Sequence, residues 1–205
     1  MVEYIEQGAG GRLAVMEAGR HILPFEEKII TSGKCPALLP CVVFDNMGRR
    51  ALHYGAAGYT PLGEFCVGSL DQALGLLYMI PQTVGEAEDW LLSAEKLSLA
   101  ADGVYIGATS PGPGAGAIIR EVRLIYGFPG RKPFRTQYAE LLETMASWGH
   151  IPGLGAASRQ IGERIQIENP GMRALLRIVE AARREWNLIQ PEPAREAPAI
   201  HGPKA

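Results

Sequence analysis

The chain has 205 residues, of which 47% are hydrophobic and 20% are charged. This length suits one ordinary domain, or two small lobes that share a core, and the composition excludes extensive disorder. The formal net charge of −2 argues against a nucleic-acid partner, because nucleic-acid binders usually carry a basic excess. The longest apolar runs, such as residues 73–80, are too short to cross a bilayer, and the N-terminus shows no signal-peptide pattern. We therefore expect a cytoplasmic protein without a membrane span.

The first sixty residues predict strands with one helix. Glycines at 8–11 separate two short alternating runs, which is typical of a β-hairpin, and a second hairpin is predicted around the turn at 45–48. Between the hairpins, a short helix is predicted to start near Pro24 and to end at Gly33.

The middle of the chain changes character. Residues 69–80 place apolar side chains at helical spacing behind Ser69, a suitable N-cap. Pro81 is expected to stop or kink this helix, and residues 84–97 predict a second one. Residues 90–107 also fit a strand, a turn at Asp102-Gly103 and a strand back, and residues 118–128 predict a further strand.

The C-terminal third predicts helices. Residues 131–149, 155–168 and 172–189 all have helical periodicity, whereas residues 191–205 are rich in Pro and Ala and predict a disordered tail or linker. Strands that come first and helices that come later favour an α+β fold over an alternating parallel sheet. The order fits a small β-rich lobe and a larger helical lobe that join near residues 55–65.

Motifs for metal, nucleotide or hydrolytic chemistry are absent from the sequence. Cys35, Cys41 and Cys66 lack CxxC spacing and a nearby pair of histidines, so we expect buried free thiols rather than zinc ligands. The glycine-rich runs at 8–11 and 112–116 do not lead from a strand into a helix, as a phosphate site requires. We therefore expect no cofactor and no metal.

A basic stripe near the end of the last helix has two interpretations. It consists of Arg173, Arg177, Arg183 and Arg184. Cations near a helix C-terminus are favoured by the helix dipole, which is a purely structural reason for the stripe. The alternative is a docking surface for an acidic or phosphorylated partner.

Three segments resemble protein kinases. Residues 91–107 (LLSAEKLSLAADGVYIG) resemble the stretch that runs from the kinase catalytic loop into the strands before the magnesium-binding motif. Within it, residues 94–97 stand where kinases show a Pro-Glu-Asn-Ile-like run. Residues 52–65 resemble the fifth strand, the hinge and the start of the next helix, and residues 25–33 lie where the N-lobe helix belongs.

The groups needed for phosphoryl transfer are missing from these segments. A kinase needs a carboxylate that orients the nucleophile, an amide and a carboxylate that hold magnesium, and a lysine on the nucleotide phosphates. Here the position of the catalytic base holds Leu91, and the metal-binding asparagine is replaced by Lys96. Residues 106–114 offer no acidic side chain, no Val-Ala-Ile-Lys-like strand precedes the first helix, and the first hairpin lacks GxGxxG. The resemblance therefore implies a pseudokinase.

A closer resemblance covers roughly residues 2–190. The order of residues 35–65, 90–107 and 121–130 is similar to an uncharacterised bacterial kinase-like domain that usually precedes a forkhead-associated (FHA) module. That domain is in turn similar to the pseudokinase of type VII secretion systems. The resemblance implies a degenerate, protein-kinase-like, two-lobed α+β fold.

This resemblance also implies the domain limits. Residues 1–190 would form the kinase-like domain, with a small antiparallel N-lobe at about 1–58 and a larger helical C-lobe at about 59–190. Residues 191–205 lie where a linker to an FHA module would begin. The chain would then be either cut at that boundary or a stand-alone relative.

The expected function is a non-catalytic interaction or scaffold module, not an enzyme, in bacterial signalling or secretion-related assembly. Its partner would be a protein, with no nucleic acid involved. A first alternative is a nucleotide or small-molecule sensor that binds in the cleft between the lobes without turnover. The hinge backbone at Ala56, Ala57, Gly58 and Tyr59 provides weak candidates for binding that ligand.

A second alternative is an enzyme with unconventional catalytic residues. It would require Glu26, Glu27 or Lys28 on the first helix to converge with Asp102.

Overall fold

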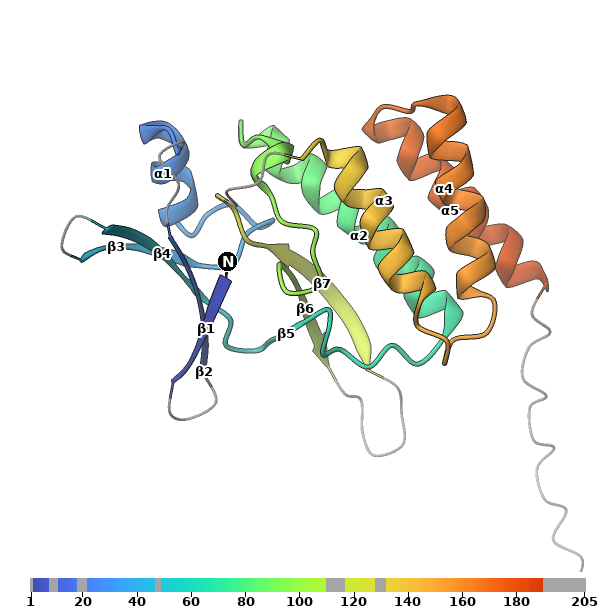
Figure 1. Cartoon of the computed structure of the whole chain (residues 1–205), viewed down its shortest axis with the longest axis horizontal. Helices are drawn as coiled ribbons and strands as arrows, with labels where there is room; N and C mark the ends of the chain where they lie inside the picture. Colours follow the sequence, from blue (N-terminus) through green and yellow to red (C-terminus); the bar gives the residue numbers. More distant parts are fainter. Residues whose placement is uncertain are drawn as a thin grey trace, which may run out of the picture.

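The structure of the chain, a computed structural model, describes residues 2–7, 11–17, 22–46, 49–109, 117–127 and 132–189. It is a mixed α+β fold with two small antiparallel sheets and several helices, which confirms the predicted α+β class (Figure 1). Some predicted features fall outside the described residues, namely the turns at 8–10 and 47–48, the loop at 110–116 and the tail at 191–205.

The first sheet contains the two predicted hairpins. Strands β1 (Val2–Gln7), β2 (Gly11–Glu17), β3 (Cys41–Asn46) and β4 (Arg49–Gly55) form a four-stranded antiparallel sheet in the order β1-β2-β4-β3. Helix α1 (Pro24–Thr31) lies between the hairpins in the chain and contacts β3. The predicted helix is therefore confirmed, with Gly33 at φ +66° just beyond its end.

The second sheet contains β5 (Tyr59–Pro61), β6 (Val104–Thr109) and β7 (Ile118–Leu124) in the order β5-β6-β7. The strand predicted before the Asp102-Gly103 turn is wrong. Residues Ala94–Lys96 form one turn of 3-10 helix, labelled η1, and Leu97 then makes an isolated bridge with Tyr126. The reason is that both sides of β6 are already paired, with β5 and with β7, so no place beside β6 remains for residues 97–101.

The turn into β6 requires glycine. The Gly103 N–H donates to the Ala100 carbonyl at 2.8 Å, and a Cβ atom on Gly103 would lie 2.1 Å from Ser98 Oγ. No side chain can occupy that space, so the backbone of Gly103 passes directly over the buried Ser98.

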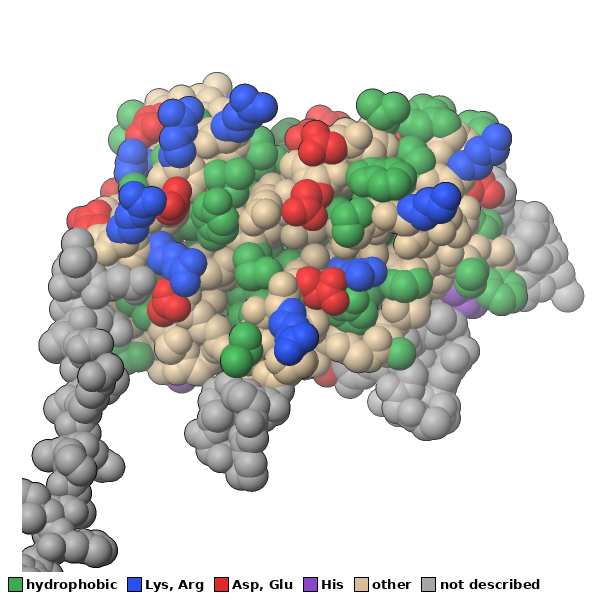
Figure 2. Space-filling view, turned by 180° about the vertical axis from the view of Figure 1, so that it is seen from behind, with side chains coloured by type: hydrophobic (Ala, Val, Ile, Leu, Met, Phe, Trp, Pro, Cys, Tyr) green, Lys and Arg blue, Asp and Glu red, His purple; other side chains and the backbone are tan. Residues whose placement is uncertain are grey.

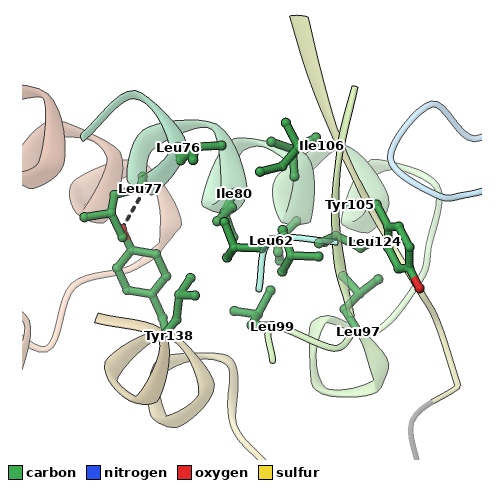
Figure 3. Packing of buried hydrophobic residues seen from close by; sticks show 14 of the residues in the cluster. Leu62, Leu76, Leu77, Ile80, Leu97, Leu99, Tyr105, Ile106, Leu124 and Tyr138 are labelled. Carbon is green, nitrogen blue, oxygen red and sulfur yellow. Dashed lines mark hydrogen bonds between the residues drawn. The ribbon is translucent and has the colours of Figure 1, made fainter. Parts of the chain in front are cut away.

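The remaining helices pack beside the second sheet. They are α2 (Leu70–Asp89), α3 (Phe134–Ala146), α4 (Leu154–Glu168) and α5 (Met172–Ile189). Figure 1 shows α2 next to β6 and β7, with the other three helices beyond it. Leu76 and Ile80 of α2 face Leu62 and Ile106 of the sheet (Figure 3). No helix in the described part of the chain is long and apolar enough to span a membrane.

Pro81 does not stop the helix, so the prediction of two separate helices on either side of it is wrong. Helix α2 runs unbroken from Leu70 to Asp89 with Pro81 inside it. A proline at this position has no N–H to donate to the carbonyl four residues earlier, that of Leu77. The Tyr138 hydroxyl on α3 donates to that carbonyl at 2.6 Å instead, as the dashed line in Figure 3 shows. A side chain from another helix thus replaces the missing backbone hydrogen bond.

We expect Tyr138→Phe to lower the free energy of unfolding by about 1–3 kcal/mol, because it leaves the buried Leu77 carbonyl without a partner. The loss should shrink in a Pro81→Ala background, where residue 81 regains an N–H. Urea unfolding of the four variants measures this coupling. Tyr78→Phe, on the half-exposed side of the same helix, is the control, and an equal effect of Tyr78→Phe and Tyr138→Phe would contradict the assignment.

Candidate functional site

Charged and polar side chains from distant parts of the sequence meet in a buried cluster between the two sheets. We call it the Glu26 cluster, and it consists of Glu26 on α1, Tyr54 on β4, Lys96 on η1 and Tyr126 just after β7. Only 3% of the surface of Glu26 is exposed, and Lys96 and both tyrosines are also buried.

Four hydrogen bonds saturate the Glu26 carboxylate. Lys96 Nζ lies 2.7 Å from both Oε1 and Oε2, and the Tyr126 hydroxyl donates to Oε1 at 2.7 Å. The Leu23 N–H donates to Oε2 at 2.8 Å. Burial by itself would raise the pKa of Glu26, but the hydrogen bonds from Lys96, Leu23 and Tyr126 outweigh it and hold the pKa below its usual value. Glu26 is therefore ionised at neutral pH.

Local structure places the two charged residues. Glu26 is the third residue of α1, where a carboxylate can receive an N–H from the residue before the helix, here Leu23. Lys96 ends η1, and its backbone is fixed by two bonds: its N–H donates to the Ser93 carbonyl at 3.0 Å, and its carbonyl accepts from the Gly127 N–H at 2.8 Å. Both side chains thus start from rigid backbone.

The two tyrosines extend the cluster to the first sheet. The Tyr126 hydroxyl, besides donating to Glu26, accepts the Ser93 N–H at 3.2 Å. The Tyr54 hydroxyl donates to the Tyr126 carbonyl and accepts the Tyr126 N–H at 3.2 Å. Burial raises the pKa of both tyrosines, and it raises the pKa of the Cys41 thiol beside Tyr54 to about 12.

This arrangement is suited to holding elements together rather than to reaction chemistry. Glu26, with a lowered pKa, is a poor general base, and a thiol with a pKa of about 12 is a poor nucleophile at neutral pH. The described residues also contain no group of three or more His, Cys, Asp or Glu side chains placed to hold a metal ion.

The unconventional enzyme would require Glu26, Glu27 or Lys28 to converge with Asp102, but the hydrogen bonds of the Glu26 carboxylate come from Lys96, Tyr126 and Leu23. Glu26 does point into the interior, but its carboxylate meets Lys96. Glu27 is half-buried and Lys28 is exposed, and neither belongs to the Glu26 cluster. Sequence reasoning identified Lys96 as a replaced asparagine and missed its partner, because no spacing rule links residues 70 positions apart.

Leu91, to which the kinase resemblance gives the position of the catalytic base, lies just beyond the end of α2. Its N–H donates to the Glu88 carbonyl at 2.8 Å, and the Leu92 N–H donates to the Ala87 carbonyl at 3.1 Å. This pair of bonds is the Schellman motif, whose turning residue is usually glycine. Leu91 accordingly has φ +61°, and 75% of its surface is exposed.

The hinge residues form a tight turn. The Ala56 carbonyl accepts the Tyr59 N–H at 3.0 Å, and Gly58 has φ +82°, as the third position of a type II turn requires. Ala57 and Gly58 are exposed, and Tyr59 continues into β5, which pairs with β6. The turn therefore uses the Ala56 carbonyl and the Tyr59 N–H, two of the backbone groups that were candidates for binding a ligand.

The four arginines of the basic stripe differ in their surroundings. Arg183 pairs with Asp71 of α2 through two hydrogen bonds of 2.9 and 3.2 Å, and Arg184 pairs with Glu180 one turn earlier. Arg173 and Arg177 are exposed and take part in no ion pair within the described residues. Figure 2 shows Lys and Arg side chains gathered over the end of the molecule formed by the C-terminal helices, with acidic side chains among them.

The comparisons with known proteins do not add to these observations. No family model matches the sequence, and no curated protein matches it.

The Glu26–Lys96 pair should be essential for stability. Lys96→Met leaves a buried carboxylate without its cation, so we expect it to lower the free energy of unfolding by about 3–5 kcal/mol. Glu26→Met/Lys96→Met, which removes both charges, should recover most of that loss. Lys132→Met is the matched control, since Lys132 and Glu140 form an exposed pair with a 2.6 Å contact, worth less than about 1 kcal/mol. Urea unfolding would contradict the assignment if Lys96→Met lowered the free energy of unfolding no more than Lys132→Met does.

The pH dependence of stability provides a second check on the same pair. Because the pKa of Glu26 is lowered in the folded chain, its contribution is complete above its usual value of 4.5 and is lost as the pH falls through the folded-state pKa. The free energy of unfolding of the unmodified chain should therefore fall more steeply below about pH 4.5 than that of Glu26→Gln.

Proposed function

We propose that the chain is a non-catalytic interaction module with a degenerate, two-lobed kinase-like fold. In this proposal the first sheet and α1 form the N-lobe, up to about residue 58, and the second sheet with α2–α5 forms the C-lobe. The chain leaves the first sheet at Gly55 and enters the second at Tyr59, which suits a boundary at the turn between them. We propose a cytoplasmic role in bacterial signalling or secretion-related assembly, on the strength of the resemblance alone.

The main support for a non-catalytic role is that Lys96 is paired with Glu26. In active kinases a lysine of the third strand pairs with a glutamate of the N-lobe helix and contacts the nucleotide phosphates, while an asparagine of the catalytic loop holds magnesium. Here Lys96 takes the place of that asparagine and itself binds Glu26 of α1 through both carboxylate oxygens. A cation in this position repels magnesium.

The alternative of a nucleotide sensor has less support. A nucleotide would need backbone groups of the hinge, but the Ala56 carbonyl and the Tyr59 N–H already bind each other. It would also need a cation for its phosphates, while the buried Lys96 is paired with Glu26. These two observations favour a protein partner over a nucleotide.

We expect millimolar ATP or ADP, with or without magnesium, to leave the midpoint of thermal unfolding unchanged. Ligand at about 100 times its dissociation constant would raise the free energy of unfolding by about 2.7 kcal/mol. For a domain of this size, that would raise the midpoint of thermal unfolding by several degrees. A shift without magnesium would favour the sensor, and a shift that needs magnesium would contradict the assignment of Lys96. Differential scanning fluorimetry makes the measurement.

The partner we propose is an acidic or phosphorylated protein segment that binds the exposed stripe of α5. Arg173 and Arg177 are one helical turn apart, so their side chains project from the same face. Guanidinium groups bind phosphate through paired, charge-assisted hydrogen bonds. Arg183 and Arg184 are less available, because Asp71 and Glu180 already bind them. An FHA module in a longer form of the protein would bring a second binding surface.

A degenerate phosphothreonine peptide library, measured by fluorescence polarisation, should bind the chain more tightly than its unphosphorylated counterpart. We expect Arg173→Ala/Arg177→Ala to weaken this binding about tenfold, as the loss of charge-assisted hydrogen bonds predicts. Arg164→Ala is the control, since Arg164 pairs with Glu168 on the exposed surface of α4. Equal binding of the two libraries, or an equal loss in the control, would exclude this surface.

A further inference from the structure

A groove between α3 and α4 is separate from the Glu26 cluster and from the arginine stripe. Its volume is about 190 Å³. It is lined by the small residues Ala139, Ala146 and Gly162 and by Leu142, and also by the polar residues Glu143, Ser158, Arg159, Glu163 and Gln166. Larger side chains at these positions would fill the space between the helices. A Cβ atom built on Gly162, for example, would lie 4.0 Å from the Leu142 side chain. The groove therefore exists because small residues occur on both helices.

A buried hydroxyl in the lining of this groove has no partner. Only 3% of the surface of Ser158 is exposed, yet its Oγ makes no hydrogen bond. A serine inside a helix usually donates to the carbonyl four residues earlier, and a buried polar group without any partner is rare and destabilising. Ser158 has a single side-chain torsion, so a change of rotamer moves its hydroxyl without moving the backbone.

From the groove and the hydroxyl together, we propose a binding site for a compact, mostly apolar molecule that carries one hydrogen-bonding group. The apolar part would lie on Ala139, Leu142 and Ala146, and the polar group would bind Ser158 Oγ. The size fits a single ring, since an apolar cavity of roughly 150 Å³ is enough for benzene. Small-molecule sites usually combine an apolar surface with a few polar groups, and here the polar groups are Ser158 and the side chains at the rim of the groove, Glu143, Arg159, Glu163 and Gln166. This site is independent of the proposed function.

Phenol and toluene test the site, because they have nearly the same shape and only phenol carries a hydroxyl. We expect amide chemical shifts of α3 and α4 to change saturably with phenol, and phenol to bind more tightly than toluene. The dissociation constant of toluene divided by that of phenol measures the contribution of the hydroxyl, because the two rings pack in nearly the same way. In Ser158→Ala the dissociation constant of toluene divided by that of phenol should fall at least fivefold.

Two further variants separate loss of the site from loss of the fold. Ala146→Leu fills part of the groove and should abolish binding of both probes. Gly75→Ala, at a half-buried position of α2 outside the groove, should leave both unchanged. Without ligand, Ser158→Ala should keep or raise the midpoint of thermal unfolding, because it removes an unpaired hydroxyl. A lowered midpoint would show that Ser158 has a partner and would overturn the proposal. So would chemical-shift changes that do not saturate, or an unchanged toluene-to-phenol ratio of dissociation constants in Ser158→Ala.

Discussion

The rest of the structure depends on one buried carboxylate. Glu26 carries its charge into the interior, where an ion is tolerated only when its oxygens are fully paired. That requirement holds Lys96, Tyr126 and the Leu23 N–H at hydrogen-bonding distance from the oxygens of Glu26. Through Tyr126 the constraint reaches Tyr54, and so the first sheet is held against the second by hydrogen bonds as well as by packing.

In the helical part, too, a buried polar group is bonded by a side chain from another element. Pro81 deprives the Leu77 carbonyl of its backbone donor, and the hydroxyl of Tyr138 supplies the replacement from α3. In both places a buried polar group inside one element is satisfied by a side chain remote in sequence. Such bonds join elements in a defined orientation, because a hydrogen bond has direction whereas apolar contact does not.

The pairing of the buried charged groups limits which groups are free to bind a ligand. Glu26 and Lys96 hold α1 to η1, and the backbone of residues 56–59 closes its own turn. What remains available lies at the surface, as the two unpaired arginines of α5 and the groove between α3 and α4. Our proposals of a protein partner and of a small-molecule site rest on these two surface features.

The sequence by itself determined the elements whose signals are local. Alternating runs around glycines predicted both hairpins, Pro24 and Gly33 predicted the limits of α1, and helical periodicity predicted α3, α4 and α5. These patterns depend on near neighbours. Tertiary structure alone decided that α2 continues through Pro81, that residues 90–101 form no strand, and that Glu26 meets Lys96. Each of these outcomes depends on a partner 29 to 70 residues away, such as Tyr126 for Leu97, and no local pattern encodes such a distance.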